Sequence, residues 1–177
     1  MYPKRIKQFY IGFTSIFKKI TREDLELVKS HLNEVEYSLF NKYYEYDKKH
    51  VLRVAKDIEK ICTDEGINSS KKSLLIKTAL LHDMGKIKAK INILDRVILV
   101  LLNKMLGDKA KSLKIKKVQV YYNHGFMGYE ILKDYIKDDE ILFLIKNHHI
   151  KNIESLQYND YDYIKDLNLL MKCDEEN

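Results

Sequence analysis

The chain has 177 residues, of which 45% are hydrophobic and 33% charged, so it can build a core and is not expected to be mainly disordered. Its length suits one domain, or one domain with a short appendage. The formal net charge of +6 comes from lysines distributed along the chain, with only four arginines. This pattern predicts solvated helix faces or attraction of a small anionic ligand. Because no nucleic-acid-reading motif is present, no nucleic-acid partner is expected.

Cysteines and hydropathy bear on where the protein acts. Cys62 and Cys173 have no paired spacing and lie in apolar-periodic stretches, which predicts reduced core thiols in a cytoplasmic protein. The N-terminus lacks an apolar signal core. The most apolar run, 91–106, contains charged residues and is too short for a stable membrane span. An amphipathic helix lying on a membrane surface remains an alternative for this run.

Helical periodicity dominates the first half of the chain. Thr21 and Asp24 resemble a capping box, and Gly66 is placed to end a helix in a left-handed conformation. Ser69 or Ser70 is the expected N-cap of the helix that follows. The predicted helices are 4–18, 21–46, a third that carries residues 51–62, and a fourth that ends at 81.

Four more helices are predicted in the second half, with Gly107 closing the first of them. Their ranges are 92–106, 117–135, 138–148 and 161–174. No hairpin signal, internal repeat or composition break is present. We therefore expect an all-α fold, a single compact helical bundle in which N-terminal helices within 1–46 pack on a domain formed by 47–177.

The doublet His82-Asp83 is the strongest chemical signal. It directly follows the apolar run 79–81, where a histidine and a carboxylate are costly to bury unless a partner compensates both. A divalent metal is such a partner, because imidazole and carboxylate are common ligands of transition metals. Gly85 is expected to let the chain turn there. Lys86, three residues after Asp83, is expected on the same side, within reach of a metal-bound phosphate.

Further metal ligands must come from distant parts of the chain. The candidates lie beside apolar residues that would bring them inward: His50, His124, His148, His149 and Asp174. His31 stands apart and is expected at the surface or as a filler. Any one of these histidines alone is more often an ordinary hydrogen-bonded residue, but the set together favours a metal site.

Residues 47–174 resemble the HD-domain metal-dependent phosphohydrolase superfamily, because His50, the His82-Asp83 doublet, His124, His148 and Asp174 occur in its order. The string His82-Asp83-Met84-Gly85-Lys86 is similar to that of its HDIG subgroup. The resemblance implies an α-helical bundle with one or two divalent ions (Mn, Fe, Zn or Mg). It also implies the following roles: His50, His82, Asp83 and Asp174 bind a first metal; Asp83 bridges to a second metal held by His124 with His148, His149 or both; Lys86 contacts the substrate phosphate or assists the leaving group.

The chain departs from parts of that family. Tyr46 stands where the three-metal HD-GYP members have a glutamate, and Gly128-Tyr129 is followed by Glu130 instead of proline. A cyclic-di-GMP phosphodiesterase of that subgroup is therefore not expected. Residues 87–120 form an insert with a basic stretch at 109–117, which is a candidate lid or substrate rim.

The resemblance predicts an enzyme that cleaves a phosphate ester or phosphoanhydride of a small nucleotide or dinucleotide, with Asp83 and Lys86 as catalytic residues. Tyrosine-rich stretches at 43–46, 121–122 and 158–163 would allow base stacking, although ordinary packing at helix edges is the more common reason for such stretches. The alternatives are a nucleotide-sensing module without turnover and a membrane-surface adaptor. Neither the substrate nor the oligomeric state follows from the sequence.

Overall fold

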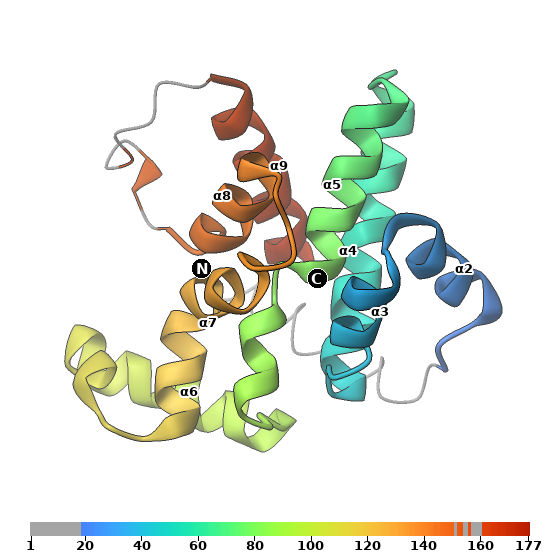
Figure 1. The fold of residues 1–177 in the computed structure, drawn as a ribbon. Coiled ribbons are helices and arrows are strands. Elements are labelled where there is room, and N and C mark those ends of the chain that lie inside the picture. The colour runs from blue at the N-terminus through green and yellow to red at the C-terminus, as the bar shows by residue number, and fades with distance from the viewer. Residues whose placement is uncertain (1–18, 151, 154–155, 157–160) are drawn as a thin grey trace.

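The structure is a computed structural model that describes residues 19–150, 152–153, 156 and 161–177. Within these ranges it contains eight α-helices, two short 3-10 helices and no strand, which confirms the all-α prediction (Figure 1). The predicted helix 4–18 lies outside the described residues. The elements are α2 Arg22–His31, α3 Glu34–Phe40, α4 Glu45–Asp64, α5 Ser69–Leu81, η1 Met84–Lys88, α6 Ile93–Leu106, η2 Gly107–Ser112, α7 Lys116–Leu132, α8 Asp139–Asn147 and α9 Tyr161–Glu176.

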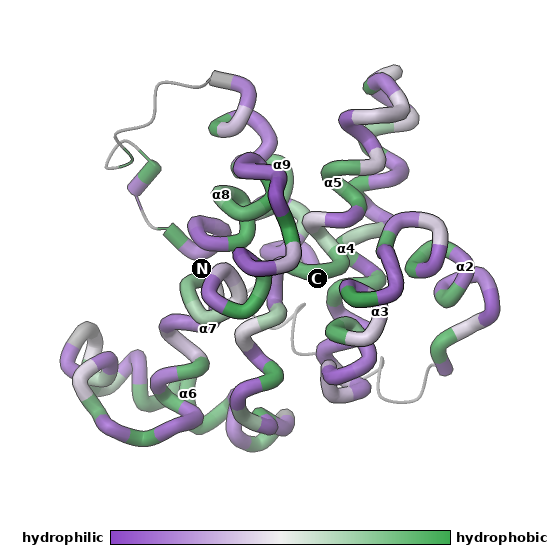
Figure 2. Tube along the Cα trace, viewed as in Figure 1, coloured by the Kyte–Doolittle hydropathy of each residue, from purple (hydrophilic) through white to green (hydrophobic). Residues whose placement is uncertain are grey.

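The main core lies between the pair α4–α5 and the pair α8–α9. Helices α4 and α5 run side by side, α8 packs on α5, and α9 contacts α4, α5 and α8 (Figure 1). Hydrophobic and hydrophilic residues alternate along these helices (Figure 2), and the buried hydrophobic residues of the four helices belong to one cluster. The largest completely buried side chains include Ile58, Leu75, Ile76, Leu80, Leu81, Leu144, Ile145, Leu167 and Leu170. Burial on this scale supplies most of the stabilisation of a helical bundle.

The helix predicted for 21–46 is in fact two helices. Thr21 does form the expected capping box with Asp24, but α2 ends at His31, and Asn33 begins α3 with a second capping box that includes Glu36. The chain then turns at 41–44 before α4 begins at Glu45. Both short helices send side chains into the main core, including Val28 and Phe40. The division of the chain at residue 46 stays a prediction.

Two smaller expectations concern the junction of α4 and α5. Gly66 has a φ of +66°, as expected for a helix C-terminus. The N-cap of α5 is Asn68 and not Ser69 or Ser70 as predicted. The side-chain oxygen of Asn68 accepts a hydrogen bond from the Lys71 amide. Asparagine and serine cap helices equally well, so the sequence alone could not separate them.

The insert 87–120 packs around a small core of its own. Helix α6 begins at a capping box of Asn92 and Asp95 and is closed by Gly107, as predicted. It packs on η2, and together with η1 and α7 it surrounds a cluster that contains Ile91, Leu99 and Val118. Helix α7 ends at Leu132, three residues earlier than predicted.

A buried charged cluster ties three helices of the main core together. Nζ of Lys71 on α5 lies 2.5 Å from Oε1 of Glu140 on α8 and 2.6 Å from Oδ2 of Asp166 on α9. Both carboxylates are buried. One ammonium group therefore faces two carboxyl groups from residues that follow it by 69 and 95 positions in the chain.

Candidate metal centre

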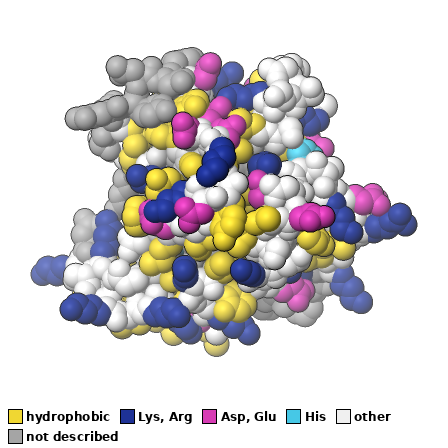
Figure 3. All heavy atoms as spheres, viewed as in Figure 1, with side chains coloured by type: hydrophobic (Ala, Val, Ile, Leu, Met, Phe, Trp, Pro, Cys, Tyr) yellow, Lys and Arg dark blue, Asp and Glu magenta, His cyan; other side chains and the backbone are white. Residues whose placement is uncertain are grey.

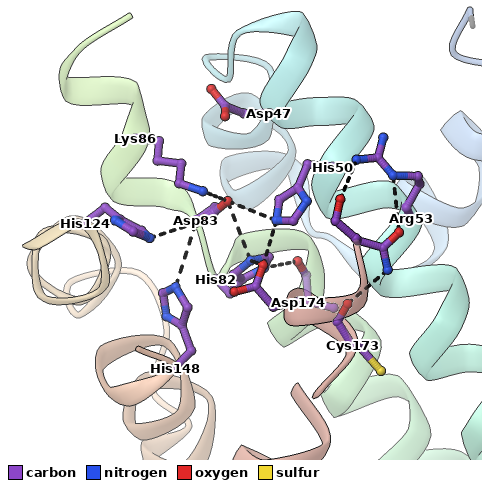
Figure 4. A network of polar contacts seen from close by, with 12 residues as sticks. Asp47, His50, Arg53, His82, Asp83, Lys86, His124, His148, Cys173 and Asp174 are labelled. Carbon is purple, nitrogen blue, oxygen red and sulfur yellow. Dashed lines mark hydrogen bonds and ion pairs between the residues drawn. The ribbon is translucent and has the colours of Figure 1, made fainter. Parts of the chain in front are cut away.

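His82 and Asp83 lie at the junction between α5 and η1 and are completely buried. Helix α5 ends at Leu81, and the two residues form the turn before the 3-10 helix begins at Met84. Figure 4 shows Asp83 at the centre of a group of side chains that converge from α4, α7, α8 and α9. The structure thus brings together all seven side chains singled out as candidate ligands.

The first group of potential ligands combines His50 of α4, His82 and Asp174 of α9. One donor atom from each lies within 4.8 Å of the others. Nε2 of His50 is 2.8 Å from Oδ1 of Asp174, and Nε2 of His82 is 3.6 Å from the same oxygen. Oδ2 of Asp83 faces this group, at 3.4 Å from Nε2 of His50 and 3.6 Å from Nε2 of His82.

The second group lies on the other side of Asp83. It combines Asp83 with His124 of α7, His148 at the end of α8 and the following His149, again with donor atoms within 4.8 Å. Oδ1 of Asp83 is 3.2 Å from Nε2 of His124 and 3.8 Å from Nε2 of His148. The His149 side chain is 48% exposed and its Nε2 lies 3.9 Å from Asp174, so it stands at the solvent side of the group.

Backbone hydrogen bonds fix the orientation of three of the histidine rings. Nδ1 of His82 lies 2.8 Å from the carbonyl oxygen of Ala79, and Nδ1 of His148 lies 2.7 Å from that of Ile145. Nδ1 of His124 is 3.1 Å from the carbonyl oxygen of Val120. A carbonyl can only accept, so each Nδ1 carries the hydrogen and each Nε2 is left with a lone pair directed into the site.

The donor set fits a metal ion. Nε2 of His82, His124 and His148 and Oδ1 of Asp83 are buried, and none has a hydrogen-bond partner among the described residues. Buried polar atoms without partners are rare because each costs about 1–3 kcal/mol. A cation bound between them would satisfy all of these atoms at once.

Electrostatics favour ionised carboxylates among mostly neutral imidazoles. Burial raises the pKa of Asp83, but Lys86 and His82 outweigh it and hold the pKa well below its usual range. Burial and then the charge of Lys86 lower the pKa of His124 to about 4, and burial lowers that of His50. Burial also acts to lower the pKa of His82, but the charges of Asp83 and Asp174 outweigh the effect of burial, so the pKa of His82 is raised. Neutral imidazole and ionised carboxylate are the metal-binding forms.

Lys86 contacts the Asp83 carboxylate directly. It lies in η1, and its Nζ donates a hydrogen bond to Oδ2 of Asp83. Its side chain is 12% exposed, so the ammonium group is largely removed from water. The expected placement on the side of Asp83 is therefore found, and it positions a fixed positive charge at the edge of the two ligand groups (Figure 4).

Gly85 has a different role from the one expected. Its φ is not positive, so the turn does not require glycine for a left-handed conformation. Instead, η1 packs directly on α7, and a Cβ at Gly85 would lie 2.1 Å from the backbone oxygen of His124. Glycine therefore allows the segment that carries Asp83 to approach the helix that carries His124.

Tyr43, which the sequence singled out only as part of a tyrosine-rich stretch, is a neighbour of the site. It lies buried in the turn before α4. Burial, and then the charges of Asp83 and Asp47, raise the pKa of its hydroxyl well above the usual value, so it stays neutral. The ring of Tyr46 stacks under the Arg96 guanidinium, 4.3 Å from its centroid, and Tyr121 packs edge-on against Tyr122. Tyr158 lies outside the described residues.

His31 and the two cysteines lie where the sequence around them predicted. His31 lies on α2, remote from both ligand groups, with its Nδ1 bonded to the Leu27 carbonyl. Cys173, beside Asp174, is buried and free, as is Cys62.

The model of the HD domain family matches residues 48–174, which is more than two thirds of the chain. No curated protein and no solved structure matches it.

Proposed function

The chain belongs to the HD domain family, and from this premise we propose that it is a metal-dependent phosphohydrolase acting on a small nucleotide or dinucleotide. The observation that carries the proposal is the position of Asp83, whose two oxygens face two separate groups of histidines. A carboxylate between two such groups is suited to bridge two divalent ions. Assignment to the HDIG-type subgroup stays a prediction.

We assign the first ion to His50, His82, Asp83 and Asp174, and the second to Asp83, His124, His148 and His149. Mixed nitrogen and oxygen donors suit Mn, Fe or Zn, and the carboxylates would also accept Mg. When bound, such ions supply Lewis acidity and lower the pKa of a coordinated water. Phosphate hydrolysis needs both, because the phosphorus centre is shielded by anionic oxygens.

The chain itself contributes rigidity and charge. The backbone carbonyls of Ala79, Val120 and Ile145 hold three imidazoles in place, so little reorganisation is needed when ligands bind. Lys86 brings an ammonium group to the edge of the site, where it would donate hydrogen bonds to a phosphate oxygen or to the leaving oxygen. Asp83 and Lys86 are therefore the residues to which we assign the largest effects on turnover.

Metal removal and reconstitution test the proposal. The protein would be stripped with a chelator, reloaded separately with Mn²⁺, Fe²⁺, Zn²⁺ or Mg²⁺, and assayed for phosphate release from mononucleotides, cyclic nucleotides and dinucleotides. We expect turnover of at least one class with at least one metal, and none in the stripped protein. Nucleotide binding by calorimetry without turnover under any metal would contradict the enzyme and support the sensing module.

A further inference from the structure

Helix α6 carries a row of large apolar side chains exposed to solvent. Leu94 is 70% exposed, Ile98 61%, Leu101 53% and Met105 82%. Their spacing of four, three and four residues places them along one face of the helix. No other helix in the described part of the chain has so many large hydrophobic residues exposed. We call this set the α6 stripe.

The stripe is not the face with which α6 packs on the rest of the molecule. Leu99 is buried in the cluster it forms with Ile91 and Val118, and lies on the opposite side of α6. Arg96, on that side too, places a guanidinium nitrogen 2.6 Å from Oδ1 of Asp47. Helix α6 is thus apolar on two faces, and only the inner one has a partner among the described residues.

The positive charge of the chain is concentrated around the α6 stripe. Residues 88–117 hold eight lysines and Arg96 against only Asp95 and Asp108, a net charge of +7 in a chain of +6. The lysines themselves are spread along the chain, but acidic residues are scarce in this segment. Exposed Lys104 lies within the sequence span of the stripe, and further exposed lysines flank it on both sides: Lys88, Lys90, Lys109, Lys111, Lys114 and Lys116. Figure 3 shows dark blue side chains beside yellow ones at the end of the molecule where α6 lies.

We propose that the α6 stripe and its flanking lysines dock on an anionic lipid surface, a role that goes beyond the proposed hydrolysis. The apolar row would enter the boundary between headgroups and acyl chains while the lysines contact anionic headgroups. The described part of the chain has no helix with the length and apolarity needed to cross a membrane. With 14 residues α6 is about 21 Å long, so it lies in the interface.

Charge favours an anionic lipid surface over the other possible occupants of the α6 stripe. A second copy of the chain, docked through the same surface, would bring the net charge of +7 on its residues 88–117 against that of the first copy. Residues 1–18 carry Lys4, Arg5, Lys7 and Lys18 and no acidic residue, so their charge does not complement the lysines around the stripe either. A nucleic acid would match the lysines but would leave the row of Leu94, Ile98 and Met105 in water. An anionic lipid surface satisfies both the charge and the apolar row.

Docking would hold the metal centre near the lipid surface. Arg96 on α6 pairs with Asp47 on α4, and Asp47 lies one helical turn before His50. In addition, Nζ of Lys117 on α7 is 2.7 Å from Oδ1 of Asp95 on α6. Helix α6 is therefore joined by ion pairs to two helices that carry candidate metal ligands.

Vesicle sedimentation with the full chain tests the proposal. The probes are vesicles of phosphatidylcholine alone and vesicles that also contain phosphatidylserine. The stripe variant is Ile98→Gln, Leu101→Gln and Met105→Gln, which keeps helix propensity and removes exposed apolar groups. The charge variant is Lys109→Gln, Lys114→Gln and Lys116→Gln. The control is Val35→Gln with Tyr135→Gln, which removes two exposed apolar side chains elsewhere.

We expect the wild-type chain to sediment with the anionic vesicles and not with phosphatidylcholine alone, and to be released by salt. The stripe variant and the charge variant should each bind the anionic vesicles at least about ten-fold more weakly than the wild type, while the control binds as the wild type does. Circular dichroism would verify that every variant is folded.

Three results would overturn the proposal. The first is a wild-type chain that does not sediment with anionic vesicles. The second is a folded stripe variant that binds these vesicles as tightly as the wild type. The third is a wild-type dimer, seen by light scattering, that the stripe variant converts to monomers, because a second copy would then cover the stripe. None of these outcomes depends on whether the protein hydrolyses phosphate esters.

Discussion

Gly85 packs so closely on His124 that a Cβ at Gly85 would lie 2.1 Å from the backbone oxygen of His124. This contact sets the distance between η1, which follows Asp83, and α7. We expect Gly85→Ala to destabilise the protein by about 3 kcal/mol, because backbone atoms on both sides would have to move. Thermal unfolding measures the loss. Gly66→Ala serves as control: its Cβ would meet nothing within 4 Å, so it costs only the strain of a positive φ, about 1 kcal/mol. Equal losses in the two variants would contradict the steric account.

Asp83→Ala is expected to abolish turnover and to empty at least one metal position, because Asp83 faces both ligand groups. Plasma mass spectrometry of the purified protein gives the number of ions per chain, and phosphate release gives the rate. Asp64→Ala, at the exposed end of α4, should leave both unchanged. An Asp83→Ala protein with the activity and metal content of the wild type would rule out the bridging role.

Lys86→Met should lower kcat by about 10²–10³-fold while the metal content is kept, because the variant removes the ammonium group that would stabilise phosphate charge. Steady-state kinetics with the best substrate from the reconstitution screen measures this effect. Lys88→Met is the matched control, since Lys88 belongs to the same 3-10 helix but is exposed. If both variants turned over at the wild-type rate, Lys86 would have no part in the reaction.

The cluster of Lys71, Glu140 and Asp166 predicts a dependence of stability on pH. Burial, and then a hydrogen bond with Asp166, raise the pKa of Glu140 to about 7 from an ordinary value of 4.5. The folded chain therefore holds a proton that the unfolded chain releases between these two values. Its contribution to stability is complete below pH 4.5 and is lost as the pH rises through 7. Allowing for screening by water, we expect a loss of about 1–2 kcal/mol.

Glu140→Gln tests this dependence, because the amide stays neutral at every pH and can still donate to Asp166. The free energy of unfolding, measured in urea from pH 5 to pH 8, should fall more steeply for the wild type than for this variant. Glu34→Gln, at an exposed position of α3, should keep the wild-type slope. Identical slopes for the wild type and Glu140→Gln would show that Glu140 does not titrate in this range.

Local signals in the sequence predicted most helices. Gly66, Gly107 and the box at Thr21 all mark helix ends as expected, because each acts through neighbouring residues. The break between α2 and α3 was missed because the apolar periodicity continues across it, although Asn33 and Glu36 have capping-box spacing. The buried cluster around Lys71 was also missed, since residues so far apart leave no spacing pattern.

The candidate ligands could be chosen from the sequence because histidines beside apolar residues are unusual. In addition, these residues occur in the same order as the metal ligands of the HD-domain superfamily. The resemblance also implied how these residues divide into two groups around Asp83. Residue spacing alone could not supply that division, since it depends on how α4, α7, α8 and α9 pack. The role of Gly85 and the burial of Tyr43 against the doublet likewise depend on tertiary contacts.

The most direct test of the metal centre is anomalous diffraction from crystals grown with Mn²⁺ or Zn²⁺. The account predicts an anomalous peak between Asp83 and one or both of the histidine groups, with Nε2 of His82 or of His124 among the nearest atoms. A map in which these side chains are ordered and metal peaks occur only elsewhere in the crystal would contradict it.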